Sequence, residues 1–188
     1  MTNKVITVTS GHSNVGKIDS GAVTTVDGKL IKEADLAVKL RNAILHYLQQ
    51  DKEITTRCDG YGQTNLELKE AIKLIKDSHV ALEIHTNASA NKTANGIECI
   101  ALPKDKVLAQ KLSDAVAKVT GSRLRGDKGY IGQEDSARGK LGYVSNGGLI
   151  LEVFFISNDS ELEVFEEKYW LIAKEVAQVL IDYVKSKK

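Results

Sequence analysis

Two histidines and one glutamate are the residues of this sequence best suited to carry chemistry. His12 follows the strand-like run 5–9, His85 closes the strand-like run 80–84, and Glu33 lies where a helical pattern begins. Two imidazole nitrogens and one carboxylate oxygen are the ligands of many catalytic zinc ions, which keep a fourth position open for water. The residues lie too far apart in the chain to match a short zinc motif. The ligand types nevertheless predict a metal-dependent hydrolase.

Glu152 is a fourth candidate because it is the one carboxylate in the apolar run 149–156. Burial of an unpaired carboxylate is costly, so such a residue is either paired or functional. Burial also raises its pKa. A carboxylate of raised pKa beside a metal suits a general base, which takes a proton during attack and returns it to the leaving amine. The alternative is a structural salt bridge from Glu152 to Arg138 or Lys140.

Three further residues accompany the two histidines. Glu83 precedes His85 by two positions, so strand alternation places both side chains on one face. Its carboxylate can accept the second ring proton of a metal-bound imidazole, or it can pair with a lysine. Asp19 and Asn87 follow the two histidines closely. Both residue types form turns without taking part in chemistry, so we expect them to shape the surrounding loops.

The elements that must position these residues alternate between strands and helices. This order predicts an α/β domain with a mostly parallel or mixed sheet, whose strand ends bring the candidate residues to one edge. The patterns predict strands at 5–9, 54–58, 80–84, 98–102 and 149–156, a turn or hairpin at 23–28, and helices over 33–50, from about 64 to 77, after 103, and over 160–184.

Two local features carry more detailed expectations. Thr64 and Glu67 have the spacing of a capping box, in which Thr64 caps the following helix and Glu67 reaches back. That helix is expected to bury Leu68 along with Ile72 and Ile75. In the helix after Pro103, Val107 is among the residues expected to face inward.

The segment 121–148 differs from the rest of the chain. It holds eight of the 15 glycines and several basic residues, including Arg138 and Lys140. Long glycine-rich loops in compact domains are usually functional or disordered. We therefore expect a mostly irregular segment that forms a wall of the substrate groove.

Composition limits the classes of function. The 188 residues fit one domain, 1–188, and 26 basic against 25 acidic residues give a net charge of +1, which argues against nucleic acid or an anionic membrane as partner. Cys58 and Cys99 are isolated and are expected to be reduced thiols. No stretch approaches the roughly 20 apolar residues of a membrane span, and no signal peptide is expected. The protein is therefore expected to be made in the cytoplasm and not to insert stably into a membrane.

With these residues in view, the sequence resembles the zinc-dependent N-acetylmuramoyl-L-alanine amidases, a group found in bacterial autolysins and phage endolysins. The likeness covers nearly the full length. It rests on four segments: Ser10-Gly11-His12 with Asp19-Ser20-Gly21-Ala22; Glu33-Ala34-Asp35-Leu36; Ile84-His85-Thr86-Asn87-Ala88 with Gly96-Ile97-Glu98; and Leu151-Glu152-Val153-Phe154-Phe155-Ile156-Ser157-Asn158.

The resemblance implies Zn²⁺ held by His12, Glu33 and His85, with Glu152 as the catalytic glutamate. It also implies a six-stranded mixed sheet flanked by helices. The expected reaction is hydrolysis of the amide that joins N-acetylmuramic acid to the L-alanine of the peptidoglycan stem. Arg138 and Lys140 are then candidates for contact with stem carboxylates.

Two alternatives to amidase activity stay open at this point. A zinc peptidase acting within the stem peptide could use the same ligand set, and a non-catalytic wall-binding module could use the segment 121–148 as its groove. No separate cell-wall-binding module is expected within 1–188. A compact chain without an export signal looks like a phage or prophage endolysin. Such an enzyme waits in the host cytoplasm and needs a separate permeabilising protein to reach the peptidoglycan in the periplasm.

Overall fold

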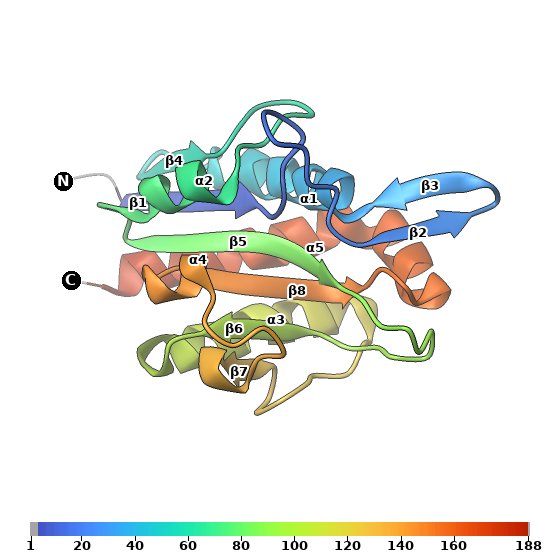
Figure 1. Ribbon diagram of the computed structural model, residues 1–188. Coiled ribbons are helices and arrows are strands. Elements are labelled where there is room, and N and C mark those ends of the chain that lie inside the picture. The colour runs from blue at the N-terminus through green and yellow to red at the C-terminus, as the bar shows by residue number, and fades with distance from the viewer. Residues whose placement is uncertain (1–3, 188) are drawn as a thin grey trace.

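A six-stranded sheet forms the centre of the molecule, as the computed structural model of the chain shows for residues 4–187 (Figure 1). From one edge to the other the strands are β4 (Ile54–Cys58), β1 (Lys4–Ser10), β5 (Val80–Asn87), β8 (Leu149–Phe155), β6 (Glu98–Ala101) and β7 (Tyr130–Gly132).

Most neighbouring strands of this sheet run parallel. β1 pairs in parallel with β4 and β5, and β5 pairs in parallel with β8. β6 runs antiparallel to β8, and β7 runs parallel to β6. The prediction of a single α/β domain with a mixed, mostly parallel sheet of about six strands is confirmed.

Helices cover the two faces of the sheet unequally. The three long helices, α1 (Glu33–Leu48), α3 (Lys106–Thr120) and α5 (Asp159–Ser186), pack on one face, where α5 contacts both α1 and α3. The short helices α2 (Leu68–Ile75) and α4 (Gly142–Ser145) lie on the other face, in front of the sheet in Figure 1. Single 3-10 turns occur at Pro103–Asp105 and Gln133–Asp135. No helix among residues 4–187 is both long and apolar enough to span a bilayer.

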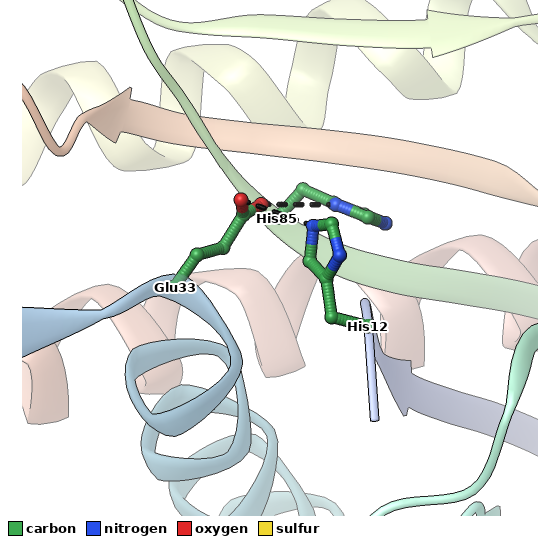
Figure 2. Close-up of side chains that lie close together, drawn as sticks. All are labelled: His12, Glu33 and His85. Carbon is green, nitrogen blue, oxygen red and sulfur yellow. Dashed lines mark hydrogen bonds and ion pairs between the residues drawn. The ribbon is translucent and has the colours of Figure 1, made fainter. Parts of the chain in front are cut away.

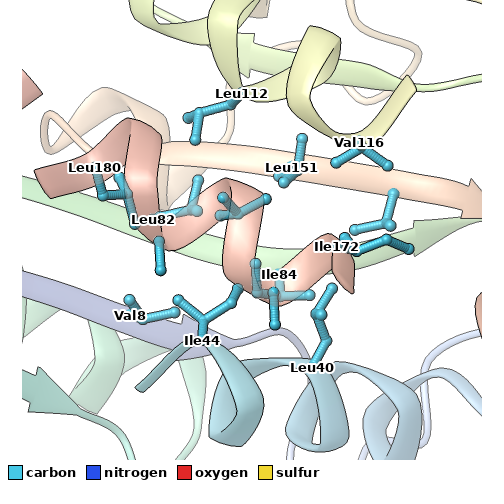
Figure 3. Packing of buried hydrophobic residues seen from close by; sticks show 14 of the residues in the cluster. Val8, Leu40, Ile44, Leu82, Ile84, Leu112, Val116, Leu151, Ile172 and Leu180 are labelled. Atoms are coloured by element: carbon cyan, nitrogen blue, oxygen red, sulfur yellow. The ribbon is translucent and has the colours of Figure 1, made fainter. Parts of the chain in front are cut away.

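The main hydrophobic core lies under the three long helices (Figure 3). Leu82 and Ile84 of β5 belong to it, whereas Ala81 belongs to a smaller cluster under α2 and α4. Because side chains alternate along a strand, Glu83 and His85 share the face of Ala81. The thinly covered face of the sheet therefore carries the polar groups, and the thickly covered face carries the core.

The hairpin of β2 (Val23–Val26) and β3 (Lys29–Lys32) projects beyond the carboxyl ends of β1 and β5 (Figure 1). It confirms the turn or hairpin expected from the sequence. Its second strand leads directly into α1, so Glu33, the first residue of that helix, lies at the edge of the sheet where β1 and β5 end.

Two local expectations were wrong. The capping box does not form, because Thr64 bonds to Tyr61 within its own loop and Glu67 accepts a hydrogen bond from the Lys17 backbone. Leu68 and Val107 are 50% and 65% exposed, although the helical pattern placed both inward. Leu68 is the first residue of α2 and Val107 is the second residue of α3. At these ends the helices do not cover the side chains against the sheet.

Candidate metal centre and active-site pocket

His12, Glu33 and His85 converge at one edge of the sheet (Figure 2). His12 follows β1, Glu33 begins α1, and His85 lies in β5. One ligand atom from each of the three lies within 4.8 Å of the others. The residues that the sequence singled out are thus brought together, although they lie far apart in the chain.

The Glu33 carboxylate contacts both imidazole rings, one with each oxygen. Its Oε2 is 3.0 Å from His12 Nε2, and its Oε1 is 3.1 Å from His85 Nδ1 (Figure 2). The backbone N–H groups of Ala22 and Thr86 donate to the same two oxygens, each at 2.9 Å. Burial alone would raise the pKa of Glu33, but the two histidines that face its carboxylate outweigh it and hold this pKa well below its usual range.

Each imidazole has a further carboxylate at its other nitrogen. His12 Nδ1 lies 3.0 Å from Asp19 Oδ2, and His85 Nε2 lies 2.9 Å from Glu83 Oε2. Such partners fix the orientation and the tautomer of a metal-binding imidazole. Burial would lower the pKa of both histidines, but the carboxylates that face their rings, Glu33, Asp19 and Glu83, outweigh it and raise the pKa.

The donor set fits a divalent metal. His12 Nε2 is buried and has no hydrogen-bond partner among residues 4–187, although Glu33 Oε2 is only 3.0 Å away. If the His12 proton is on Nδ1, facing Asp19, then Nε2 and Glu33 Oε2 both present lone pairs to the same space. A cation bound between the two atoms would accept both lone pairs and remove the repulsion between them. Two imidazole nitrogens and one carboxylate oxygen match a zinc ion with three protein ligands.

Two glycines leave the room that this cluster needs. A Cβ atom at Gly11 would lie 2.1 Å from the ring of His85, so a side chain there would displace the imidazole. Gly21 has a φ of +65°, and a Cβ there would lie 2.5 Å from the ring of His12 and 2.6 Å from Glu33 Oε2. Any other residue at either position would push a candidate ligand aside.

Glu152 lies on β8 directly beside His85, its register partner on β5. Its Oε2 is buried and has no hydrogen-bond partner among the described residues. Burial raises the pKa of Glu152 to about 7; the charges of Glu33 and Glu98 also raise it, whereas those of His85 and Arg138 lower it. The salt-bridge alternative finds no support, since no ion pair joins Glu152 to Arg138 or Lys140 within residues 4–187.

Glu98 is a site residue that the sequence reasoning did not single out. It lies opposite Glu152 in the antiparallel pair of β6 and β8, and it is 7% exposed. Asn87 Nδ2 donates to Glu98 Oε1 at 3.2 Å, and Arg125 Nε donates to Glu98 Oε2 at 2.5 Å. The available signal was a lone acid in an apolar strand, the same signal that identified Glu152.

A pocket of about 680 Å³ opens over these groups. Arg138 is among the residues that line it, whereas Lys140 is not. Of the glycine-rich segment, only the second half reaches the pocket, at 136–138 and 141–143, so the expected groove wall is shorter than the segment itself. The acidic lining residues are Asp19, Glu33, Glu67, Glu83, Glu98 and Glu152, and the apolar ones include Ile18, Leu66, Leu68 and Ile150.

Comparison with known proteins places this site in a family. Residues 6–182 match the N-acetylmuramoyl-L-alanine amidase family. A solved structure of a candidate N-acetylmuramoyl-L-alanine amidase from Neisseria meningitidis is 42% identical, with a TM-score of 0.87 and 98% of each chain covered. A comparison with curated proteins gave no match.

Two more distant structures share the fold. An N-acetylmuramoyl-L-alanine amidase from Clostridium difficile 630 is 22% identical, with a TM-score of 0.82 and all of both chains covered. The catalytic domain of the CD27L endolysin, which targets C. difficile, is 20% identical, with a TM-score of 0.68, 96% of this chain and 98% of that chain covered.

Proposed function

The chain belongs to the N-acetylmuramoyl-L-alanine amidase family, as its sequence resemblance predicted, and from this premise we propose that it is a zinc-dependent peptidoglycan amidase. The bond cleaved is the amide between N-acetylmuramic acid and the L-alanine of the stem peptide. The observation that carries this proposal is the convergence of His12, Glu33 and His85 beside Glu152 in one pocket.

In this proposal His12 Nε2, a Glu33 oxygen and His85 Nδ1 hold the metal. These are the atoms that face one another, while the remaining ring nitrogens face Asp19 and Glu83. A zinc ion held there supplies Lewis-acid chemistry: it polarises an amide carbonyl and makes water a stronger nucleophile at neutral pH.

Glu152 is the proposed proton carrier. Its buried, unpartnered Oε2 is free to accept a proton from the attacking water and to pass it to the departing L-alanine nitrogen. A pKa of about 7 suits both halves of this transfer, because the group then gains and loses a proton readily near neutral pH.

Arg138 is the proposed contact for a carboxylate of the stem peptide. It lines the pocket and makes no ion pair with another side chain among residues 4–187, so its guanidinium is available to a ligand. A guanidinium binds carboxylates through two parallel hydrogen bonds. Lys140 is a weaker candidate for this contact because it does not line the pocket.

Product analysis tests the reaction class. Purified protein is incubated with peptidoglycan, and the soluble products are identified by mass spectrometry and by labelling of new amino groups. An amidase releases intact stem peptides with a free L-alanine amino group, whereas a stem-peptide peptidase leaves L-alanine attached to the sugar. A non-catalytic wall-binding module releases nothing, and Glu152, an unpaired acid in the pocket, would have no use in such a module.

Zinc dependence is tested on the same preparation. Dialysis against a chelator should abolish release of the peptides, and about one equivalent of zinc should restore it. Full activity of protein shown to be metal-free would overturn the zinc part of the proposal and leave the reaction class to the product analysis.

We also propose host-cell lysis by a phage or prophage endolysin as the biological setting. The likeness in fold to the CD27L catalytic domain supports this setting. The enzyme would stay in the host cytoplasm until a separate permeabilising protein opened the membrane to the periplasm. Expression in a Gram-negative host, with and without such a protein, tests this: lysis only after permeabilisation is expected, and lysis by the enzyme alone would contradict it.

A further inference from the structure

The backbone of His12 adopts a conformation that needs outside support. Its φ is +66°, in the left-handed region that residues with a Cβ atom rarely occupy. Residues held in such regions persist only where the surrounding structure fixes them. The direction of the His12 ring, toward Glu33 on one side and Asp19 on the other, depends on this backbone conformation.

The side chain of Asn65 holds the backbone on both sides of His12. Asn65 is fully buried. Its Nδ2 faces three successive carbonyl oxygens, those of Ser10 at 3.4 Å, Gly11 at 3.2 Å and His12 at 2.9 Å. Its Oδ1 accepts a hydrogen bond of 2.7 Å from the backbone N–H of Asn14. The single side-chain amide of Asn65 thus contacts backbone polar groups before, at and after His12.

Asn65 is itself held by a buried ion pair. Arg41 and Asp59 are both fully buried, and Arg41 Nη1 lies 2.8 Å from Asp59 Oδ1. Arg41 Nη2 donates to the carbonyl of Thr64, next to Asn65, at 2.9 Å. Asp59 also accepts hydrogen bonds from the backbone N–H and the hydroxyl of Ser10. The loop that carries Asn65 is therefore fixed to the end of β1 and to helix α1.

The same helix carries both ends of this set of contacts. Glu33 begins α1 and Arg41 lies eight residues later, about 12 Å along the helix axis at 1.5 Å per residue. Arg41 thus attaches the loop of Asn65 to α1, and Asn65 holds the backbone of His12. Because Glu33 also belongs to α1, these contacts fix the position of His12 relative to Glu33.

From these contacts we infer that Asn65 is a positioning residue for the metal centre: it holds His12 in the left-handed conformation that directs Nε2 toward Glu33. The inference rests on the proposed metal-binding role of His12. It predicts that loss of the Asn65 amide weakens metal binding through His12 and not through a general loss of stability.

Zinc affinity, measured by competition with a chromogenic chelator, tests the inference without reference to activity. Asn65→Ala removes all four contacts. Asn65→Asp keeps the shape and an acceptor for Asn14 but replaces the donor that faces the carbonyls of residues 10–12. Both variants should bind zinc about 10- to 100-fold more weakly than the parent, the range expected when the support of a metal ligand is removed.

A double-mutant cycle separates positioning from stability. In a His12→Ala background, which lacks the ligand, Asn65→Ala should cause no further loss of zinc affinity. Asn158→Ala is the matched control, because the Asn158 side chain also joins a backbone N–H, that of Glu161, to a carbonyl, that of Ala94, but contacts none of the proposed ligands. It should lower the melting temperature and leave zinc affinity unchanged.

Three results would overturn the inference: parent-like zinc affinity in both Asn65 variants, an equal loss of affinity in the parent and His12→Ala backgrounds, or failure of both variants to fold. The last would make Asn65 a residue of the fold. Failure of the parent protein to bind zinc would instead contradict the proposed metal centre. The zinc affinity of the parent protein alone therefore distinguishes failure of the proposed function from failure of this inference.

Discussion

His85 and Glu152 are register partners on the adjacent parallel strands β5 and β8, and both line the same pocket. A proposed metal ligand and the proposed proton carrier are therefore positioned by a backbone ladder in the middle of the sheet. Rigid elements hold reacting groups more accurately than loops do. This relationship separates two roles that substitution can test independently.

Glu152→Gln should separate metal binding from turnover. The amide keeps the shape of the side chain but cannot carry the proton, so the rate of amide hydrolysis should fall about 100- to 10,000-fold, the usual contribution of general acid–base catalysis. The zinc content, measured by atomic spectroscopy, should equal that of the parent, because Glu152 is not one of the proposed ligands. Parent-like hydrolysis by this variant would remove Glu152 from the mechanism.

The rate of hydrolysis should rise with pH as Glu152 ionises. A base must be unprotonated to accept a proton, and burial raises the pKa of Glu152 to about 7. A nearby divalent cation favours the ionised carboxylate, so kcat/KM should inflect at or below about pH 7. The residual activity of Glu152→Gln should lack this inflection. A parent profile that stays flat through the acidic range would show that another group controls the rate.

Protein freed of metal should lose stability as pH rises. The folded-state pKa values of His12 and His85 lie above the ordinary 6.5, so their contribution to stability is complete below 6.5 and disappears as pH passes the folded values. The pKa of Glu33 is lowered, so its contribution is present above 4.5 and is lost only in acid. The melting temperature should therefore fall as the pH rises above 6.5.

His85→Gln is the control for this pH effect, since it removes the histidine that faces two carboxylates. Its melting temperature in the absence of metal should fall less over the same range. Addition of zinc to the parent should restore stability mainly at the alkaline end, where protons no longer compete for the imidazoles. Equal slopes for parent and variant would contradict this account.

Arg138 and Lys140 form a matched pair for the substrate-binding proposal. They are two residues apart on one loop and both are exposed, but only Arg138 lines the pocket. Arg138→Ala should raise KM for stem-peptide substrates about 10-fold or more, since a hydrogen bond to a charged group contributes about 1.5 to 3 kcal/mol. Lys140→Ala should change KM little. An equal rise in KM for both variants would contradict a specific contact with Arg138, because it would show that only the positive charge of this loop matters.

The sequence allowed the sheet, the order of elements and the converging residues to be predicted, because strand and helix periodicities are local. Strand alternation alone placed Glu83 on the face of His85, and the two side chains are hydrogen-bonded. The family resemblance supplied the ligand roles that remain proposals here.

What could not be predicted depends on contacts between distant segments. Thr64 and Glu67 have the spacing of a capping box, yet Glu67 bonds to the loop at Lys17, which no local pattern reveals. Asp19 was expected only to shape a loop, whereas it lies 3.0 Å from His12. Asn65 carries no sequence signal, because an asparagine in a polar loop is ordinary until the fold brings the backbone of residues 10–14 around it.

The most direct test of the account is the position of a bound metal. Crystals grown with zinc and measured at the zinc absorption edge should give one strong anomalous peak at bonding distance, about 2.0 to 2.2 Å, from a nitrogen of His12, an oxygen of Glu33 and a nitrogen of His85. The peak should be absent from crystals of His85→Ala grown in the same way. A peak elsewhere in the molecule, or none in the parent protein, would contradict the central claim that these three residues hold a metal ion beside Glu152.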